Sequence, residues 1–116
     1  MQKRYIVVEP SLIVAQDLAH AIRAFDPTAD VQVLSQAADV LAAVAEEKPT
    51  VVFLHREPSG DQSIRVGHAL GAAGIPVAFT GAEVEAWPEG AEVLASPFSE
   101  VTVARLLQRL LGRDPG

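Results

Sequence analysis

The chain has 116 residues, which fits one domain and is long enough to bury an apolar core without disulfides or a structural metal. It contains no cysteine, so disulfides, thiolate nucleophiles and thiolate metal sites are excluded. The formal net charge is −6, and this acidic balance argues against a nucleic-acid-binding surface. The sequence has no apolar run that could cross a bilayer and no signal-peptide pattern, so we expect a cytoplasmic protein.

Five short apolar runs, each ending at a turn signal, predict five strands. The first, third and fourth runs are nearly continuous in Val, Ile, Leu and Phe, which is typical of parallel strands buried on both faces. The second run alternates between apolar and polar residues, which favours a strand at the edge of a sheet. The predicted strands cover residues 5–8, 30–34, 50–54, 75–80 and 91–95.

Apolar residues recur at helical spacing between these strands and predict four helices. Residues 81–90 contain a proline and predict a loop with a stub helix. Four polar residues are expected to cap the helices at their N-termini, namely Ser11, Ser35, Asp61 and Ser99. The apolar stripes are Val14, Leu18, Ala21, Ile22 and Phe25; Ala37, Val40, Leu41, Val44 and Ala45; Val66, Ala69, Leu70 and Ala73; and Val103, Leu106, Leu107, Leu110 and Leu111.

The regular alternation of strands and helices predicts a single α/β domain over residues 1–116, with a frayed tail at 112–116. Such alternation gives a doubly wound parallel sheet with helices on both faces. Because crossover connections are right-handed, few topologies remain, and we expect the flavodoxin-like strand order 2-1-3-4-5.

Polar or turn-forming residues follow four of the predicted strands. Glu9 and Pro10 follow the first strand, His55 the third, Thr80 closes the fourth, and Ser96 follows the fifth. Since the carboxyl ends of parallel strands share one edge of the sheet, these residues are expected to converge there.

This plan resembles the receiver domain of bacterial response regulators, over nearly the whole chain from residue 5 to residue 111. The stretch AGIPVAFTG at 73–81, the short following loop and Pro97-Phe98 are similar to compact, single-domain receivers with a reduced fourth helix. In that family two adjacent acids follow strand one, an aspartate follows strand three and Lys-Pro follows strand five. The resemblance implies phosphoryl transfer to the aspartate with the help of Mg²⁺.

Three of these family positions are replaced in this chain. Glu9 keeps one acid, but Pro10 stands at the second, His55 at the aspartate and Ser96 at the lysine. A histidine cannot form the acyl phosphate, and proline offers no side-chain metal ligand. The sequence therefore predicts a degenerate phosphorylation pocket with no metal, no cofactor and no enzymatic activity. We expect an atypical receiver-like signalling module that acts through phosphorylation-independent protein interaction.

Several interpretations of this pocket stay open at the level of sequence. The favoured one is that His55 is a strand-end histidine hydrogen-bonded to Glu9 or to backbone. A metal site made by these two residues is disfavoured because two ligands are too few. The chain could instead be a phosphorylatable receiver that uses Glu57, Asp61 or His55, or a small-molecule sensor that uses Glu9, His55 and Ser96.

A surface near the last helix is the predicted partner interface, formed by Trp87, Val101, Leu107 and Leu111. Tryptophan is enriched where proteins bind one another, and the last helix carries more apolar residues than one core face needs. The expected partner is a histidine kinase, a regulator or another signalling protein, and a homodimer is the alternative. Neither nucleic acid nor membrane insertion is expected.

Overall fold

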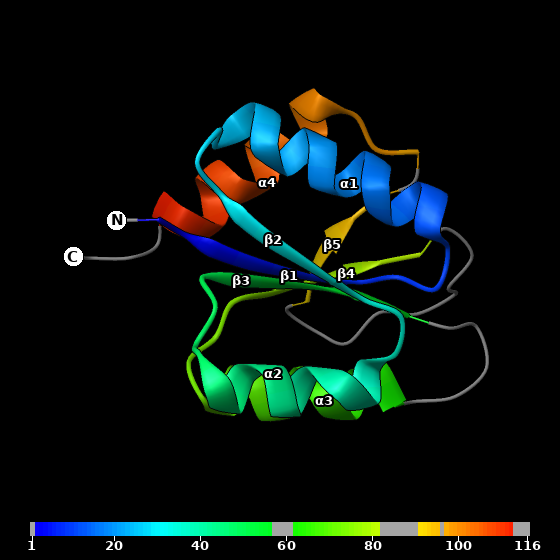
Figure 1. Cartoon of the computed structure of the whole chain (residues 1–116), viewed down its shortest axis with the longest axis vertical. Coiled ribbons are helices and arrows are strands. Elements are labelled where there is room, and N and C mark those ends of the chain that lie inside the picture. The colour runs from blue at the N-terminus through cyan, green and yellow to red at the C-terminus, as the bar shows by residue number, and fades with distance from the viewer. Residues whose placement is uncertain (1, 57–61, 82–90, 96, 113–116) are drawn as a thin grey trace.

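The computed structural model describes residues 2–56, 62–81, 91–95 and 97–112. A central sheet separates two helix layers, with α1 and α4 on one face and α2 and α3 on the other (Figure 1). The strands are β1 (Arg4–Val8), β2 (Asp30–Leu34), β3 (Val51–His55), β4 (Val77–Thr80) and β5 (Glu92–Leu94). The helices are α1 (Leu12–Phe25), α2 (Val40–Glu46), α3 (Gln62–Ala72) and α4 (Glu100–Gly112), and a short 3₁₀ helix, η1 (Ala37–Asp39), precedes α2.

The sheet is parallel throughout and has the order β2-β1-β3-β4-β5, which confirms the predicted topology and the edge position of β2. The two central strands, β1 and β3, pair so that Val8 lies opposite Leu54. On the other side of β3, His55 pairs with Thr80 at the end of β4. The register therefore brings the carboxyl ends of β1, β3 and β4 together at the same end of the sheet.

The apolar core has two layers because neighbouring residues on a strand face opposite sides of the sheet. Tyr5, Val7 and Phe53 pack toward α1 and α4, whereas Ile6 and Leu54 pack toward α2 and α3. All five side chains are fully buried. Burial on both faces explains why β1 and β3 appear in the sequence as continuous apolar runs.

The second predicted helix begins differently from the sequence-based expectation. The chain enters α2 through η1, so Ser35 does not cap it, and Gln36 precedes the 3₁₀ turn without a side-chain hydrogen bond. Val40 and Ala43 face the core, whereas Leu41 is 46% exposed. The predicted stripe is therefore wrong at Leu41 and at Ala45, which is also exposed. The tight 3₁₀ turn delays the start of the helix and sets which side of it meets the sheet.

The caps predicted for α1 and α4 are confirmed. The Ser11 hydroxyl accepts a hydrogen bond from the Val14 backbone N–H at 3.4 Å. At the start of α4, the Ser99 hydroxyl accepts from the Thr102 N–H at 3.2 Å, and the Thr102 hydroxyl accepts from the Ser99 N–H at 2.8 Å. This reciprocal pair satisfies two backbone donors that the helix itself leaves without partners. The predicted cap Asp61 lies outside the described residues.

The structure corrects one residue of the predicted interface. Leu107 is completely buried between α4 and the sheet, so its side chain is not available to a partner. Leu111 is partly buried against the same core layer, and Val101 is 57% exposed. The stub helix predicted within 81–90 and Trp87 lie outside the described residues. No helix in the described part of the chain combines the length and the apolar character needed to span a bilayer.

Candidate functional site

A pocket of about 400 Å³ opens at the carboxyl edge of the sheet. Its lining includes four of the five residues that the sequence predicted to converge there, namely Glu9, Pro10, His55 and Thr80. The fifth, Ser96, lies outside the described residues. The position of this pocket follows from strand order, because α/β sheets place their crevice where neighbouring crossovers run to opposite faces.

Backbone pairing fixes the residues of this pocket in place. The Glu9 N–H donates to the Leu34 carbonyl at 2.9 Å, which extends the β1–β2 ladder by one bond. Thr80 pairs with His55 in the β3–β4 register, and its carbonyl accepts from the Arg56 N–H at 2.9 Å. Glu9 and Thr80 are both buried, so each side chain is held by the sheet and is not free to swing into solvent.

Glu9 and His55 form a close pair within the pocket. His55 Nδ1 lies 3.1 Å from Glu9 Oε1, and the two side chains are 25% and 8% exposed. The other carboxylate oxygen, Oε2, accepts a hydrogen bond from the Ser11 backbone N–H at 2.8 Å. The Nδ1 contact lacks hydrogen-bond geometry, and Nδ1 has no hydrogen-bond partner although it is buried. The predicted proximity is therefore present, but the hydrogen bond from His55 Nδ1 to Glu9, one of the two partners that the sequence left open, is absent.

The chemistry of the pair follows from this burial. A carboxylate removed from water is costly unless a donor or a positive charge compensates it. The Ser11 N–H supplies one donor to Glu9, and a protonated His55 would supply the charge. Nδ1 of His55 can carry a proton, since nothing in the described structure donates a hydrogen bond to it.

Several residues of the pocket wall were not assigned to the site from sequence. Ser11, Val14, Leu18, Gly81 and Phe98 complete the lining. Gly81 has a φ of +130°, and a Cβ there would lie 3.0 Å from the Arg56 carbonyl oxygen, so only glycine fits without strain. Its place directly after Thr80 at a strand end is the sequence signal that could have identified it.

The pocket does not fit Mg²⁺, the cation that the receiver resemblance implies. Magnesium prefers an octahedron of hard oxygen ligands and is usually held by carboxylates together with water. Among the described residues the pocket supplies one carboxylate, Glu9, with Oε2 engaged by Ser11 and Oε1 beside a nitrogen. Pro10 supplies no side-chain ligand. This donor set is too poor in oxygen and too close to an imidazole for a magnesium centre.

A second cavity, of about 580 Å³, lies between α1 and the start of α4. We call it the α1–α4 groove; its lining is Val14, Asp17, His20, Ala21, Pro97, Phe98, Ser99 and Glu100. Val14 and Phe98 line both the groove and the Glu9–His55 pocket. Three large apolar side chains on the same two helix starts are exposed, with Leu12 at 64%, Ile13 at 74% and Val101 at 57%.

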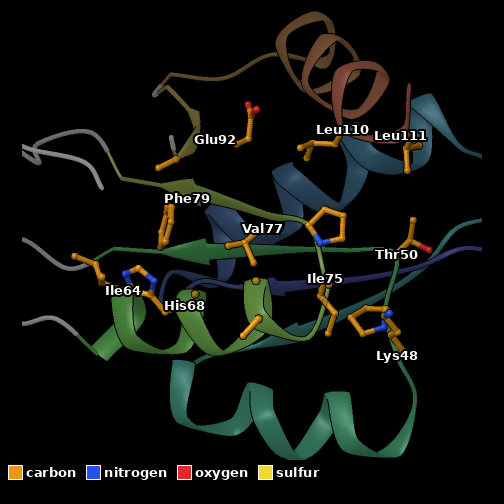
Figure 2. A pocket seen from close by; sticks show the side chains of 17 residues that line it. Lys48, Thr50, Ile64, His68, Ile75, Val77, Phe79, Glu92, Leu110 and Leu111 are labelled. Atoms are coloured by element: carbon orange, nitrogen blue, oxygen red, sulfur yellow. The ribbon is translucent and has the colours of Figure 1, made fainter. Parts of the chain in front are cut away.

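A third cavity, of about 1000 Å³, has a wall that includes none of Glu9, Pro10, His55 and Thr80 (Figure 2). Its wall combines Ile64 and His68 of α3, Phe79 of β4, Glu92 of β5 and Leu110 of α4. Glu92 is engaged by Arg109 at 2.7 Å.

Comparison with known proteins supports the fold. Neither a protein-family model nor a curated protein matches the sequence. Among solved structures, SdrG from Sphingomonas melonis has 26% identity and a TM-score of 0.77, over 95% of this chain and 97% of that one. The receiver domain of the PhyR response regulator from Erythrobacter litoralis has 22% identity and a TM-score of 0.79, over 99% and 94%.

A longer protein is also similar. NtrX from Brucella abortus has 18% identity and a TM-score of 0.76, and the match covers 97% of this chain but only 27% of that one. The same fold therefore occurs both as nearly a whole chain and as one part of a larger protein. With its 2-1-3-4-5 parallel sheet and these structural neighbours, the chain has the receiver fold of the response regulators.

Proposed function

We propose that this protein is a receiver-like signalling module that acts by binding a protein partner and does not accept a phosphoryl group. The observation that carries the proposal is the Glu9–His55 pair at the pocket where strand ends converge. A signalling role is supported by the structural neighbours, which include response-regulator receiver domains. SdrG has also been solved in a BeF3-activated conformation.

Phosphoryl transfer to a carboxylate needs a nucleophilic carboxylate, a metal and a cation that offsets the charge of the transferred group. At the end of β3 this chain presents the imidazole of His55, which cannot form an acyl phosphate. Among the described residues the pocket offers a single carboxylate, that of Glu9, which is too few for the Mg²⁺ that phosphoryl transfer uses. These features support a pocket that does not take part in phosphotransfer.

Partner binding is supported by the α1–α4 groove and its surroundings. Single exposed apolar residues are ordinary, but a group of them beside a groove is typical of an interaction surface. Leu12, Ile13 and Val101 are exposed where α1 and α4 begin, next to a groove lined by Val14 and Phe98. We therefore propose the α1–α4 groove and its exposed apolar rim as the partner surface. Leu107 is not part of it, because its side chain is buried. The partner class we expect is another signalling protein, such as a histidine kinase or a regulator.

The test is incubation of the whole chain with a small phosphodonor and Mg²⁺, followed by intact-mass measurement. We expect no stoichiometric mass increase, whereas a receiver that carries the aspartate gains one phosphoryl group under the same conditions. A matched variant carries Pro10→Asp, His55→Asp and Ser96→Lys, which returns the replaced side chains to the family pattern. Phosphorylation of the wild-type chain at Glu57, Asp61 or His55 would contradict the proposal and favour the phosphorylatable alternative.

A further inference from the structure

We infer that the α1–α4 groove binds a single amphipathic helix of the partner, with apolar side chains on one face and a Lys or Arg among them. The inference rests on the proposed function, which puts partner binding at this groove, and it adds the shape and the charge of the segment that binds. Three features of the groove support it, namely its helical wall, its acidic lining and the exposed apolar side chains beside it.

The wall of the groove formed by α1 has the spacing of a helix face. Val14 and Ala21 are about two turns apart, which is roughly 10 Å along the helix axis. Asp17 lies between them on the same face, since side chains three and four residues apart are neighbours on a helix. Phe98, just before α4, adds an aromatic side chain to the same lining. A helix laid against α1 presents its side chains at a matching spacing, whereas an extended segment repeats every two residues and does not match.

The lining of the groove is acidic. Among its described residues the charged side chains are Asp17 and Glu100, with no Lys or Arg. Glu100 has a partner within the chain, because His20 Nε2 lies 3.3 Å from its Oε1. The Asp17 side chain has neither a hydrogen bond nor an ion pair in the described structure. Covering this carboxylate with apolar atoms alone would cost free energy, so the partner must bring a cation to it. One such polar position within an apolar seam also fixes the register of two helices.

The exposed apolar side chains beside the groove favour a protein segment over a small ligand. Leu12, Ile13 and Val101 are all more than half exposed at the starts of α1 and α4. They are not part of the lining of the cavity of about 580 Å³, so a small molecule within it would leave them in water. A helix that extends beyond the groove covers them as well, and the removal of their apolar surface from water favours the complex.

Two other occupants fit the charge of the groove less well. In a symmetric dimer the same patch meets itself, so two acidic linings would face each other. The anionic surface of a membrane would meet the same carboxylates on a chain whose net charge is −6. A cationic amphipathic helix is the occupant for which both the apolar and the acidic side chains of this surface are favourable.

The experiment titrates three synthetic peptides into the isotope-labelled whole chain and follows its amide NMR signals. Each peptide has about 18 residues, because shorter isolated helices are marginal in water. The first, the Lys peptide, is an amphipathic helix with Leu on one face and Lys within and beside that face. The second, the Glu peptide, has Glu in place of Lys, and the third has the composition of the first in an order that breaks the apolar face. We expect the Lys peptide to bind about tenfold more tightly than the other two, with shifts centred on Val14, Asp17, Ala21 and Phe98.

Exchange of charge tests whether Asp17 is recognised locally. Asp17→Lys is expected to weaken binding of the Lys peptide by about tenfold and to strengthen binding of the Glu peptide. The matched control is Glu46→Lys, which makes the same change in net charge at an exposed residue of α2, on the other face of the sheet (Figure 1). Ile13→Ser is expected to weaken binding by about tenfold, whereas Leu41→Ser on α2 is expected to leave it unchanged. All four residues are exposed, so none of these substitutions alters the core.

Equal binding of the Lys and Glu peptides would overturn the inference, as would equal losses of affinity in Asp17→Lys and Glu46→Lys. Groove signals that shift with protein concentration in the absence of peptide would assign the groove to a second copy, and shifts with vesicles of anionic lipid would assign it to a membrane. The outcome is separate from that of the phosphodonor experiment. A chain that gains no phosphoryl group but binds the Glu peptide at the groove would retain the proposed function and lose the cationic helix.

Discussion

The two His–Glu pairs of this protein contain the same side chains at similar separations in different surroundings. His55 and Glu9 lie 3.1 Å apart at the ends of adjacent strands and are mostly buried. His20 and Glu100 lie 3.3 Å apart across two helices and are mostly exposed. The two pairs therefore differ in how deeply they are buried and in how firmly their side chains are held. The distance between the two side chains does not by itself show which pair contributes to the fold.

Physical chemistry assigns different roles to the two pairs. A pair removed from water interacts through a lower effective dielectric, and removal of one partner leaves an uncompensated group inside the protein. An exposed pair gains little, because water and salt screen it and ordering two mobile side chains costs entropy. Glu9 and His55 are therefore a fixed pair that lines the strand-end pocket, whereas His20 and Glu100 are mobile side chains that line the surface groove.

The largest expected change in the free energy of unfolding comes from apolar residues on α4, where a buried and an exposed side chain can be compared in the same way. Leu107 is fully buried and Val101 is 57% exposed. Leu107→Ala should lower the free energy of unfolding by about 2–5 kcal/mol, since it leaves a cavity in the core. Val101→Ala should change it by less than about 0.5 kcal/mol. Urea unfolding measures both, and a similar loss in the two variants would contradict the assignment of Leu107 to the core and Val101 to the surface.

The next largest effect is the coupling energy of each His–Glu pair, which a double-mutant cycle measures. His55→Ala should lower the free energy of unfolding by about 1–3 kcal/mol, because Glu9 then remains buried beside an empty space. His20→Ala should change it by less than about 0.5 kcal/mol. Each cycle is completed with Glu9→Ala or Glu100→Ala, measured by urea unfolding. Equal coupling energies in the two cycles would show that burial does not distinguish the pairs.

A third polar pair sharpens the comparison through pH. Tyr5 is fully buried, and its hydroxyl lies 3.5 Å from Asp26 Oδ2. Burial, followed by the charge of Asp26 and its hydrogen bond, raises the pKa of Tyr5 to about 12. In the unfolded chain the Tyr5 hydroxyl ionises near pH 10. The stability that depends on a neutral Tyr5 is therefore fully present below about pH 10 and is lost as the pH rises toward 12.

The measurement is tyrosinate absorbance, because Tyr5 is the only tyrosine in the chain. We expect the folded protein to titrate near the raised value and the denatured protein near pH 10. Asp26→Asn should lower the folded midpoint, and Tyr5→Phe should abolish the transition. A folded midpoint near 10 would contradict the burial of the hydroxyl beside a carboxylate.

The sequence was sufficient to predict the element order and the sheet order. Two-sided burial of β1 and β3 requires continuous apolar runs, and right-handed crossovers leave few ways to connect them. The convergence of Glu9, His55 and Thr80 followed from that order alone. These predictions succeeded because they depend on strand ends, which the topology places without any detail of side-chain packing.

The predictions that failed depend on how helices rotate against the sheet. Periodicity placed Leu41 in a core stripe, and the surplus of apolar residues on the last helix made Leu107 a candidate for the interface, whereas Leu41 is 46% exposed and Leu107 is buried. No pattern of apolar residues in the sequence indicated the 3₁₀ turn before α2. This turn sets which side of α2 packs against the sheet. The missing hydrogen bond at His55 Nδ1 depends on a difference in angle, which residue types cannot specify.

The smallest expected effect is the salt dependence of the two pairs. Raising ionic strength from about 0.01 M to about 1 M shortens the screening length from about 30 Å to about 3 Å, which acts mainly on exposed charges. The coupling energy between His20 and Glu100 should therefore fall toward zero in high salt, whereas that between Glu9 and His55 should be largely retained. Repeating both cycles at the two salt concentrations checks this. If salt removed the coupling of both pairs, Glu9 and His55 would have to be as open to solvent as the groove, and burial could not be what fixes them as a site.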